Sequence, residues 1–332
     1  MSFLFRFGAG IAVALVAACG PPVPAASPSP ELGTRPAVAP TRMTPAFARQ
    51  VRADELGRVP ILMYHRLVEK PRSVYDRTPA DFTAELERLA AEDYVPVTTA
   101  DLLSRRLDLP AGTHPVVLTF DDGDPSVFTL TPEGQPAQGT AVRILMDVAA
   151  AHPRFRPVAS LYVNEHPFGG DQRALRWLSD HHFEIGNHTA RHTNLRRADE
   201  AEASAAIAQG DALIRQALPG YAPSTLALPY GAQPRREGLA LQGPGYAYRG
   251  ALLVGAGPAP SPCSRAFEPA AIPRIRSQSS GKEAEYGSVH WLDQLGSPAG
   301  HRYTSDGDPE TVSYPRSDAA PAPACAGVSL AY

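Results

Sequence analysis

The sequence predicts an α/β protein built as a closed barrel of parallel strands and helices, and three observations predict it. From residue 59 onward, short apolar runs alternate with turns and with segments whose apolar residues keep helical spacing. The runs are apolar on both faces, as strands of a parallel sheet covered by helices are. The chain has 332 residues, and seven or eight strand–helix units favour a barrel over an open sheet.

The expected elements follow from these runs. Thr78-Pro79-Ala80-Asp81 predicts a helix start, with a capping hydroxyl, a proline in the first turn and an acid at the third position. Further helices are expected at about 141–151, 172–181, 198–217 and 283–294. The expected strands are 59–65, 94–97, 115–120, 158–163, 183–186, 226–230, 252–255 and 272–275.

The first residues indicate export. Arg6 precedes an apolar run over 7–18, which at about 1.5 Å per residue is too short for a bilayer core of about 30 Å. We interpret residues 1–18 as a signal peptide. Val16-Ala17-Ala18-Cys19 resembles the lipobox of bacterial lipoproteins, which predicts acylation of Cys19 and a cell-envelope lipoprotein, periplasmic or at the cell surface. The alternative is an ordinary signal peptide cut nearby, with Cys19 incidental.

The rest of the chain divides by composition. Residues 19–57 are rich in proline and alanine and predict a semi-rigid linker behind the lipid anchor. Residues 58–316 hold the single predicted catalytic domain, and residues 317–332 form a second Pro/Ala-rich stretch, a C-terminal tail. After export, Cys263 and Cys325 remain in an oxidising compartment, where a disulfide would tie the tail to the body. Two free thiols are the alternative.

The charge balance excludes one class of partner. Lys and Arg number 31 against 34 Asp and Glu, a formal net charge of −3, whereas a nucleic-acid binder would show a basic excess. A neutral substrate needs no excess of charge of either sign to attract it.

Three predicted strand ends carry side chains of the types that bind metals or transfer protons. The strand over 115–120 runs into Asp121-Asp122-Gly123, and Gly186-Asn187 precedes His188-Thr-Ala-Arg-His192. On a helical turn, His188 and His192 would share one face and both reach a metal. The third strand end is Leu228-Pro-Tyr-Gly231. Each motif alone is more often a turn or a structural pair. Together, two imidazoles and a carboxylate make a tripodal metal site with open positions.

Thr119-Phe-Asp-Asp-Gly123, His188-Thr-Ala-Arg-His192 and Leu228-Pro-Tyr-Gly231, in this order, resemble the motifs of polysaccharide deacetylases, the family-four carbohydrate esterases with the NodB-homology domain. The resemblance spans about residues 58–280 and implies a distorted (β/α)7 barrel. It also implies that Asp122, His188 and His192 bind a divalent metal, most often Zn²⁺, with Co²⁺ or Ni²⁺ as alternatives. Asp121 would be the general base, and the backbone N–H of Tyr230 would help to hold the oxyanion.

Two departures from the family pattern leave roles open. The histidine that would protonate the leaving group has no clean C-terminal match, so His65, His290 and His301 are candidates. His65 is favoured because a strand ending in Tyr64-His65 resembles the circularly permuted exopolysaccharide deacetylases. Ala227 stands where an arginine usually orients the catalytic aspartate. Arg274 or Arg276, in Ile272-Pro-Arg-Ile-Arg276, would supply that guanidinium.

The sequence thus predicts a monomeric, metal-dependent hydrolase that removes acetyl groups from an N-acetylglucosamine-containing glycan. Two alternatives stay open. One is a carbohydrate O-acetyl esterase, and the other is a lipoprotein that binds glycan without turnover. Which polymer is the substrate is not predicted.

Overall fold

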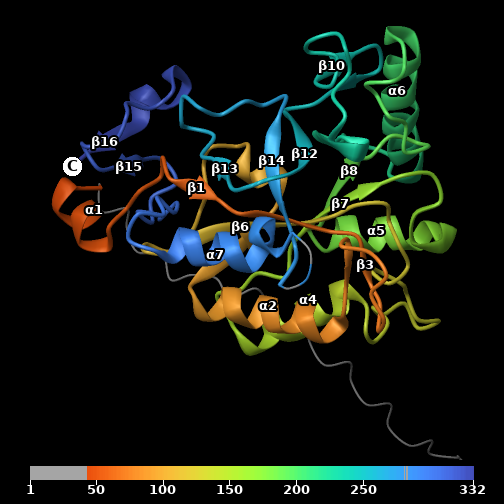
Figure 1. The fold of residues 1–332 in the computed structure, drawn as a ribbon, viewed down its shortest axis with the longest axis horizontal. Helices are drawn as coiled ribbons and strands as arrows, with labels where there is room; N and C mark the ends of the chain where they lie inside the picture. The colour runs from red at the N-terminus through yellow and green to blue at the C-terminus, as the bar shows by residue number, and fades with distance from the viewer. Residues whose placement is uncertain (1–42, 280, 282) are drawn as a thin grey trace, which may run out of the picture. The chain divides into compact units, whose positions relative to one another are not determined.

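Seven parallel strands form the wall of a closed barrel in the computed structural model, which describes residues 43–279, 281 and 283–332 (Figure 1). β2 pairs with β6 on one edge and with β14 on the other, so the first and last strands of the ring are neighbours. In order around the barrel, the strands are β2 (Ile61–Tyr64), β14 (Ile272–Arg276), β12 (Gly250–Ala256), β9 (Thr225–Ala227), β8 (Glu184–Asn187), β7 (Ser160–Val163) and β6 (His114–Phe120). The predicted distorted (β/α)7 barrel is confirmed.

Helices cover the barrel, and short elements connect its parts. β5 (Tyr94–Val97) extends the sheet by pairing with the first half of β6. The helices are α1 (Pro45–Val51), α2 (Pro79–Ala91), α3 (Thr99–Leu102), α4 (Ala141–Ala151), α5 (Gln172–Asp180), α6 (Glu200–Ala217) and α7 (Ser288–Gly296), with 3-10 turns η1 (Pro167–Gly170), η2 (Pro229–Gly231), η3 (Ala284–Tyr286) and η4 (Pro323–Val328). The remaining strands are β1 (Arg58–Val59), β3 (Arg66–Leu67), β4 (Asp76–Arg77), β10 (Gln242–Gly243), β11 (Tyr246–Ala247), β13 (Ala259–Pro260), β15 (Val312–Tyr314) and β16 (Ser329–Ala331).

Strand side chains alternate between the barrel interior and the helix-covered outside. On β6, Val117 lies in the interior cluster with Tyr162 and Leu252, whereas Val116 and Leu118 lie in the outer cluster with the helices. Because successive side chains of a strand point to opposite faces, the inward series on β6 continues to the residue just past its end. That register decides which of the two aspartates after β6 enters the barrel.

Two element boundaries differ from the expectation, each for a local reason. The predicted helix at 283–294 begins at Ser288, because Glu283 has a left-handed backbone (φ 67°) and Gly287 is extended as the helix cap. The strand expected at 226–230 ends at Ala227, since Pro229 lacks an N–H for the ladder and Tyr230 has φ 60°. The predicted start of α2 is confirmed, with the Thr78 hydroxyl accepting from the backbone N–H of Asp81.

The linker and tail predictions need correction where the structure describes them. The predicted signal peptide over 1–18, Cys19 and the predicted linker up to residue 42 lie outside the described residues. From α1 onward the predicted linker packs against the barrel: Ala48 and Ala53 are fully buried, and the N–H of Asp54 donates to the carbonyl of Thr304. The predicted tail forms η4 and β16, which pairs in parallel with β15. These segments contribute buried apolar side chains and ladder bonds, so they belong to the body.

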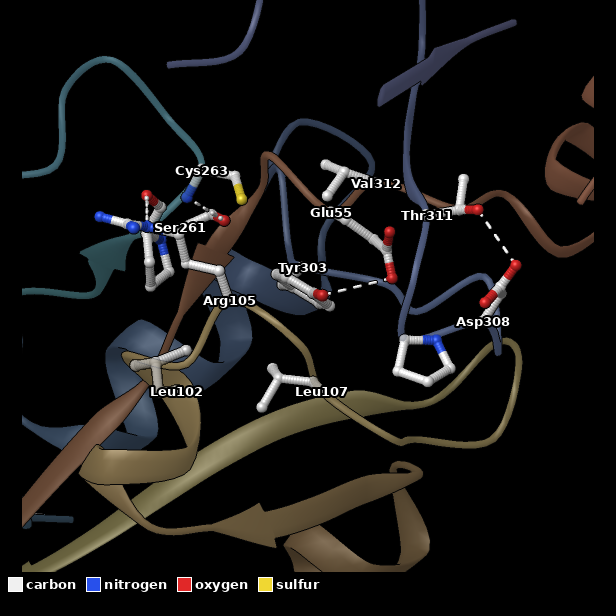
Figure 2. A pocket seen from close by; sticks show the side chains of 12 residues that line it. Glu55, Leu102, Arg105, Leu107, Ser261, Cys263, Tyr303, Asp308, Thr311 and Val312 are labelled. Atoms are coloured by element: carbon white, nitrogen blue, oxygen red, sulfur yellow. Dashed lines mark hydrogen bonds between the residues drawn. The ribbon is translucent and has the colours of Figure 1, made fainter. Parts of the chain in front are cut away.

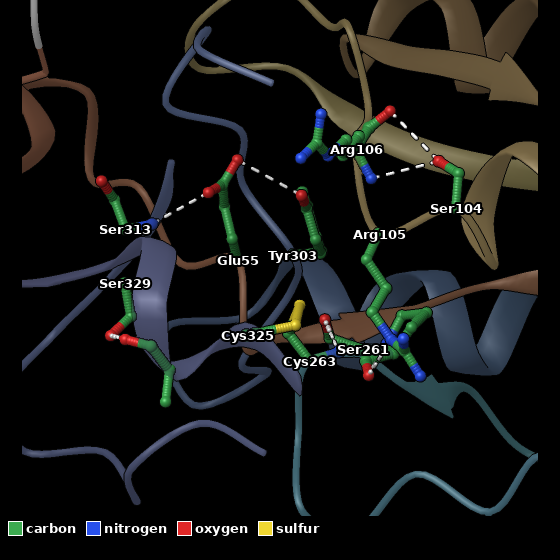
Figure 3. Close-up of a disulfide and its surroundings, with 12 residues drawn as sticks. Glu55, Ser104, Arg105, Arg106, Ser261, Cys263, Tyr303, Ser313, Cys325 and Ser329 are labelled. Atoms are coloured by element: carbon green, nitrogen blue, oxygen red, sulfur yellow. Dashed lines mark hydrogen bonds between the residues drawn. A yellow bond between two sulfur atoms is a disulfide. The ribbon is translucent and has the colours of Figure 1, made fainter. Parts of the chain in front are cut away.

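A disulfide joins the predicted tail to the body of the protein, and we call the region around this disulfide the seam. The structure pairs Cys263 with Cys325, 62 residues apart, and the N–H of Ala322 donates to the carbonyl of Cys263 (Figure 3). Both cysteines are buried and pack with Val312 and Leu56.

Glu55 is the buried polar centre of the same seam. Its carboxylate accepts from the Tyr303 hydroxyl (3.2 Å) and from the backbone N–H of Ser313 (2.9 Å). Both Glu55 and Tyr303 line a pocket of about 10 Å³, roughly the room of one water molecule (Figure 2). Burial raises the pKa of Glu55 well above its ordinary value and that of Asp306 to about 6. The seam is therefore held by hydrogen bonds to buried acids as well as by the disulfide.

Reducing the disulfide is expected to destabilise the protein by about 4 kcal/mol, because a 62-residue separation leaves a long loop free in the unfolded chain. The free energy of unfolding, measured in urea with and without a reductant, checks this. The Cys263→Ser/Cys325→Ser double variant is the control and should be insensitive to the reductant. Equal stability of the wild type under both conditions would contradict the expectation.

None of the helices in the described part of the chain has the length and apolar character needed to cross a membrane.

Candidate active site

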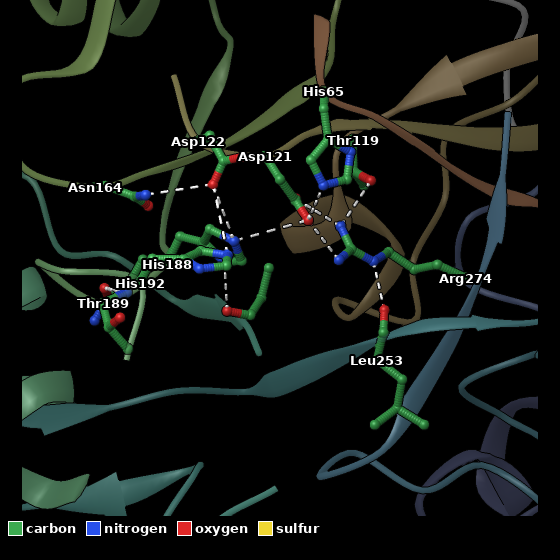
Figure 4. A network of polar contacts seen from close by, with 12 residues as sticks. His65, Thr119, Asp121, Asp122, Asn164, His188, Thr189, His192, Leu253 and Arg274 are labelled. Carbon is green, nitrogen blue, oxygen red and sulfur yellow. Dashed lines mark hydrogen bonds and ion pairs between the residues drawn. The ribbon is translucent and has the colours of Figure 1, made fainter. Parts of the chain in front are cut away.

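Titratable side chains from several strands meet at the carboxyl end of the barrel (Figure 4). His65 follows β2, Asp121 and Asp122 follow β6, and His188 follows β8. Arg274 reaches the same place from within β14. The carboxyl ends of parallel strands lie at one end of a barrel, which is why residues far apart in sequence converge here.

Asp121 is the buried centre of the cluster. It continues the inward series of β6 after Thr119, and only 1% of its surface is exposed. Arg274, itself fully buried, donates from both terminal nitrogens to the two Asp121 oxygens, each at 2.7 Å. The same guanidinium also donates to the Thr119 hydroxyl (3.1 Å) and the Leu253 carbonyl (2.6 Å). Asp121 is thereby fixed by a bidentate, charge-assisted pair.

This pairing selects between the two candidate arginines. Arg276 donates instead to the side chains of Gln278 and Glu283, and its guanidinium lies 5.7 Å from the centre of the Tyr75 ring. Of the two candidates, Arg274 is therefore the one whose guanidinium pairs with Asp121.

The charge of Asp121 follows from these neighbours. Burial alone would raise the pKa of its carboxyl, but the Arg274 guanidinium and the nearby His188 outweigh burial and hold that pKa well below its usual range. The Oδ2 atom of Asp121 lies 4.0 Å from Nε2 of His65 and 4.0 Å from Nε2 of His188. An ionised oxygen thus lies between two imidazoles at the centre of the site.

Asp122 points away from Asp121 and joins the two histidines of the second motif. With φ 72°, its backbone turns out of the strand, and its Oδ1 lies 3.5 Å from Nε2 of His188 and 3.7 Å from Nε2 of His192. One ligand atom from each of the three residues lies within 4.8 Å of the others. Two imidazoles and one carboxylate are a donor set that suits a divalent transition metal.

The state of His188 also fits a metal ligand. Its Nδ1 lies 2.8 Å from the carbonyl of Ala227, which fixes the ring and directs Nε2 into the cluster. Nε2 is buried and has no hydrogen-bond partner. Burial lowers the pKa of His188 despite the nearby aspartates, which favours the neutral imidazole that binds metals. A cation here would satisfy an orphaned buried nitrogen.

The expectation that His188 and His192 share a helical turn is wrong. The segment after β8 is a loop in which Thr189 (φ 56°) and His192 (φ 50°) have left-handed backbones. Asn187 holds this loop: its Oδ1 accepts from the N–H of Thr189 (2.7 Å), and its Nδ2 donates to Tyr248 (2.7 Å). The two imidazoles converge through turns rather than through helical spacing.

Sequence reasoning missed the supporting residues. Asn164, just after β7, donates from Nδ2 to Oδ1 of Asp122 at 3.3 Å. Gly210 of α6 leaves room for Asn187, because a Cβ there would lie 2.1 Å from the Asn187 Oδ1. One signal in the sequence could have identified both residues. Asn164 and Asn187 each come directly after a predicted strand, at 158–163 and at 183–186.

The three candidate acids lie in different places. His65 is in the site, with its side chain 18% exposed and its ring 4.9 Å from that of Tyr75. Burial lowers the pKa of His65, while the charges of Asp121 and Asp122 act in the opposite direction. His290 lies on α7 beside Trp291, and His301 lies in a separate cluster with Asp54 and Asp318.

Tyr230 lies at the rim of the site. Its ring is 4.4 Å from that of His192, and 64% of its surface is exposed. The left-handed backbone at Tyr230 and the following Gly231 form the tight turn η2. The fold therefore presents this tyrosine next to His192, one of the three candidate ligands.

The barrel and the residues at its carboxyl end define an α/β-barrel protein with a candidate metal site beside a buried aspartate. Residues 108–248 match the family model described as polysaccharide deacetylase. Over these residues the chain is similar to polysaccharide deacetylases.

Known proteins that are similar to this chain include a curated relative and a solved structure. A chitooligosaccharide deacetylase of Bradyrhizobium sp. (strain ANU 289) is 32% identical over 123 residues, which are 36% of this chain and 48% of that protein. The chain thus spans about half the length of this curated relative. The structure of the Streptococcus pyogenes deacetylase PplD in complex with acetate superposes with a TM-score of 0.56 at 20% identity, covering 73% of this chain and 99% of that one. This second similarity concerns the fold.

Proposed function

We propose that the protein is a metal-dependent deacetylase that hydrolyses the acetamido groups of an N-acetylated glycan. The observation that carries the proposal is the position of Asp121. Its anchored, ionised carboxylate lies 4.0 Å from His65 on one side and 4.0 Å from the candidate ligand His188 on the other. The family match and the relative described as a chitooligosaccharide deacetylase support the choice of reaction and substrate.

Asp122, His188 and His192 would hold the metal, and their mixed nitrogen and oxygen donors favour Zn²⁺, with Co²⁺ or Ni²⁺ also fitting. A divalent cation bound there would polarise the acetyl carbonyl and lower the pKa of a coordinated water. The buried His188, held by the Ala227 carbonyl, keeps its ligand nitrogen oriented.

The protein's own residues then divide the proton transfers. Oδ2 of Asp121 accepts a proton from the water that attacks the acetyl carbon, while Arg274 keeps that oxygen in place. The backbone N–H of Tyr230 donates to the oxygen that becomes negatively charged. Nε2 of His65 donates a proton to the sugar nitrogen as the carbon–nitrogen bond breaks, which leaves acetate and a free amine.

His65 and Arg274 bear on the alternatives left open by the sequence. A protein that binds glycan without turnover would need neither the buried guanidinium paired with Asp121 nor the His65 imidazole beside that carboxylate. The geometry therefore favours an enzyme over a binding protein. An O-acetyl esterase needs less acid assistance than an amidase, because an alkoxide leaves more readily than an amine. The position of His65 beside Asp121 therefore favours the N-acetyl substrate.

The proposal predicts acetate release from N-acetylglucosamine oligomers by the zinc-loaded protein. Removing the metal with a chelator should abolish the release, and re-adding Zn²⁺ should restore it, because the carbonyl is a poor electrophile without a cation. Acetate is measured enzymatically, with matched O-acetylated sugars as a comparison. Turnover that persists in chelator, or that occurs with O-acetyl substrates alone, would contradict the assignment.

We further propose that the enzyme acts in the cell envelope, tethered through acylated Cys19. The basis is the sequence of residues 1–19. Metabolic labelling with a radioactive fatty acid should label the wild-type chain, whereas Cys19→Ala should abolish labelling and release the protein from the membrane fraction. Unlabelled wild-type protein would rule out the anchor and leave the deacetylase proposal untouched.

A further inference from the structure

An open groove lies over the two loop segments that follow His192 and Tyr230 in the sequence. It has a volume of about 440 Å³ and is lined by Asn194, Arg196, Arg197, Gly231, Ala232 and Gln233. Gly231 directly follows Tyr230, and Asn194 comes two residues after His192. The residues that line the groove therefore follow residues at the rim of the site closely in the sequence, in both loops.

The groove carries positive charge that the protein does not neutralise. Arg196 and Arg197 are both exposed, and neither makes an ion pair with any residue in the described part of the chain. Both backbone N–H groups donate to Oδ1 of Asn194, which fixes the turn that presents the two arginines. Arg235 lies alongside, donating from Nε to the carbonyl of Arg196 (3.1 Å).

The acids on the adjoining helix α6 are engaged elsewhere. Glu200 pairs with Arg236 at 2.7 Å, and Asp199 caps α6 by accepting from the N–H of Glu202. The net charge of the whole chain is −3, so the groove departs locally from the overall balance. A neutral glycan would give these guanidinium groups no anionic partner.

We propose that the groove is a subsite for an anionic substituent of the glycan, a carboxylate or a phosphate, on a sugar next to the acetylated one. A guanidinium binds either anion through paired N–H donors, and two adjacent arginines provide this chemistry in a solvent-accessible position. The exposed ring of Tyr230 lies 4.4 Å from that of His192 and directly precedes the groove residue Gly231 in the sequence, so it would offer an apolar face to a sugar bound beside the groove. This inference rests on the proposed deacetylase function and narrows its substrate to an acidic glycan.

The test compares oligosaccharides of equal length that differ only in charge. One is a neutral N-acetylglucosamine oligomer, the second carries a carboxylate on alternate sugars, the third is its methyl ester, and the fourth carries a phosphate. For the zinc-loaded wild type, kcat/KM for one anionic substrate should exceed that for the neutral oligomer and the ester about tenfold, the size expected of two solvent-exposed ion pairs. The carboxylate and phosphate arms tell which anion is preferred, and the preference should shrink at high salt.

The Arg196→Gln/Arg197→Gln variant should lose this preference, with the change in KM rather than in kcat. Arg176→Gln is the matched control, since Arg176 is an exposed arginine on α5, and it should keep the preference. The single variants Arg196→Gln and Arg197→Gln replace the double variant if that one fails to fold. Equal rates on neutral and anionic oligomers in the wild type, or an unchanged preference in the arginine variants, would overturn the subsite.

Equilibrium binding of the same oligomers to the metal-loaded wild type separates this inference from the proposed function. Tighter binding of the anionic oligomer without acetate release from any substrate would leave the subsite in place and refute the deacetylase. Acetate release from all oligomers at equal rates and affinities would refute the subsite and leave the deacetylase proposal in place.

Discussion

Asp121→Asn should reduce kcat for acetate release by about 10²- to 10⁴-fold, the range expected when a general base is lost. The amide keeps the shape of the carboxylate but cannot accept the proton of the attacking water. Zinc content should stay close to that of the wild type, because the three candidate ligands are Asp122, His188 and His192. Stability should also fall, by about 3–5 kcal/mol, since the fully buried Arg274 loses its counter-charge.

Two controls separate these effects. Asp122→Asn should lose both metal and activity, which distinguishes a ligand from a base. Asp147→Asn makes the same change in an exposed pair with Arg143 on α4 and should leave activity and stability within experimental error. Wild-type turnover by Asp121→Asn, or loss of its zinc, would show that the two aspartates have been assigned the wrong roles.

Arg274→Met is the second change with a large expected effect, and it acts through the pKa of Asp121. In the wild type, burial would raise that pKa, but the guanidinium holds it below the ordinary value of 3.8, so the base is ionised throughout the working range. Without the guanidinium, burial dominates and the pKa rises above 3.8. The acid limb of the pH–rate profile should therefore move to higher pH, and activity near neutrality should fall.

The same shift makes a prediction for stability. A carboxyl whose folded pKa is depressed stabilises the fold above its unfolded pKa and loses that contribution only as the pH falls through the lower, folded value. The wild type should therefore keep the contribution of this pair down to about pH 4, and Arg274→Met should lack it at every higher pH. Urea unfolding at several pH values measures it, with Arg274→Lys as the variant that keeps the charge but not the bidentate geometry. An unchanged pH–rate profile in Arg274→Met would refute the assigned role.

The sequence predicted the barrel well, because apolar periodicity reports directly on which faces are buried. It could not choose between Arg274 and Arg276. The two residues are two positions apart on one strand, so alternation places both on the same face. What separates them is depth: Arg274 pairs in register with Ala256 of β12, whereas Arg276 lies at the end of β14 opposite Met63 of β2. Depth within a closed barrel depends on the stagger of neighbouring strands, which single-chain patterns do not contain.

Two other errors have different physical origins. The spacing of His188 and His192 fits a helix, but Asn187 binds the backbone of Thr189 and stabilises a left-handed turn instead. Proline and alanine content predicted a semi-rigid linker over 19–57, yet the end of this segment is held by backbone hydrogen bonds to residues more than 200 positions away, including the bond from Asp54 to Thr304. Composition describes what a segment does alone and contains no information on such partners.

The position of β2 has a consequence for how the chain is made. It is the first barrel strand to leave the ribosome or a translocation channel, yet one of its two neighbours in the ring, β14, emerges about 210 residues later. Until then the nascent chain presents an open apolar edge, the kind of surface that recruits other chains. Folding should therefore be late and all-or-none. The unfolded chain should depend on chaperones until β14 has emerged, and Cys263 and Cys325 should be oxidised only after the barrel has closed.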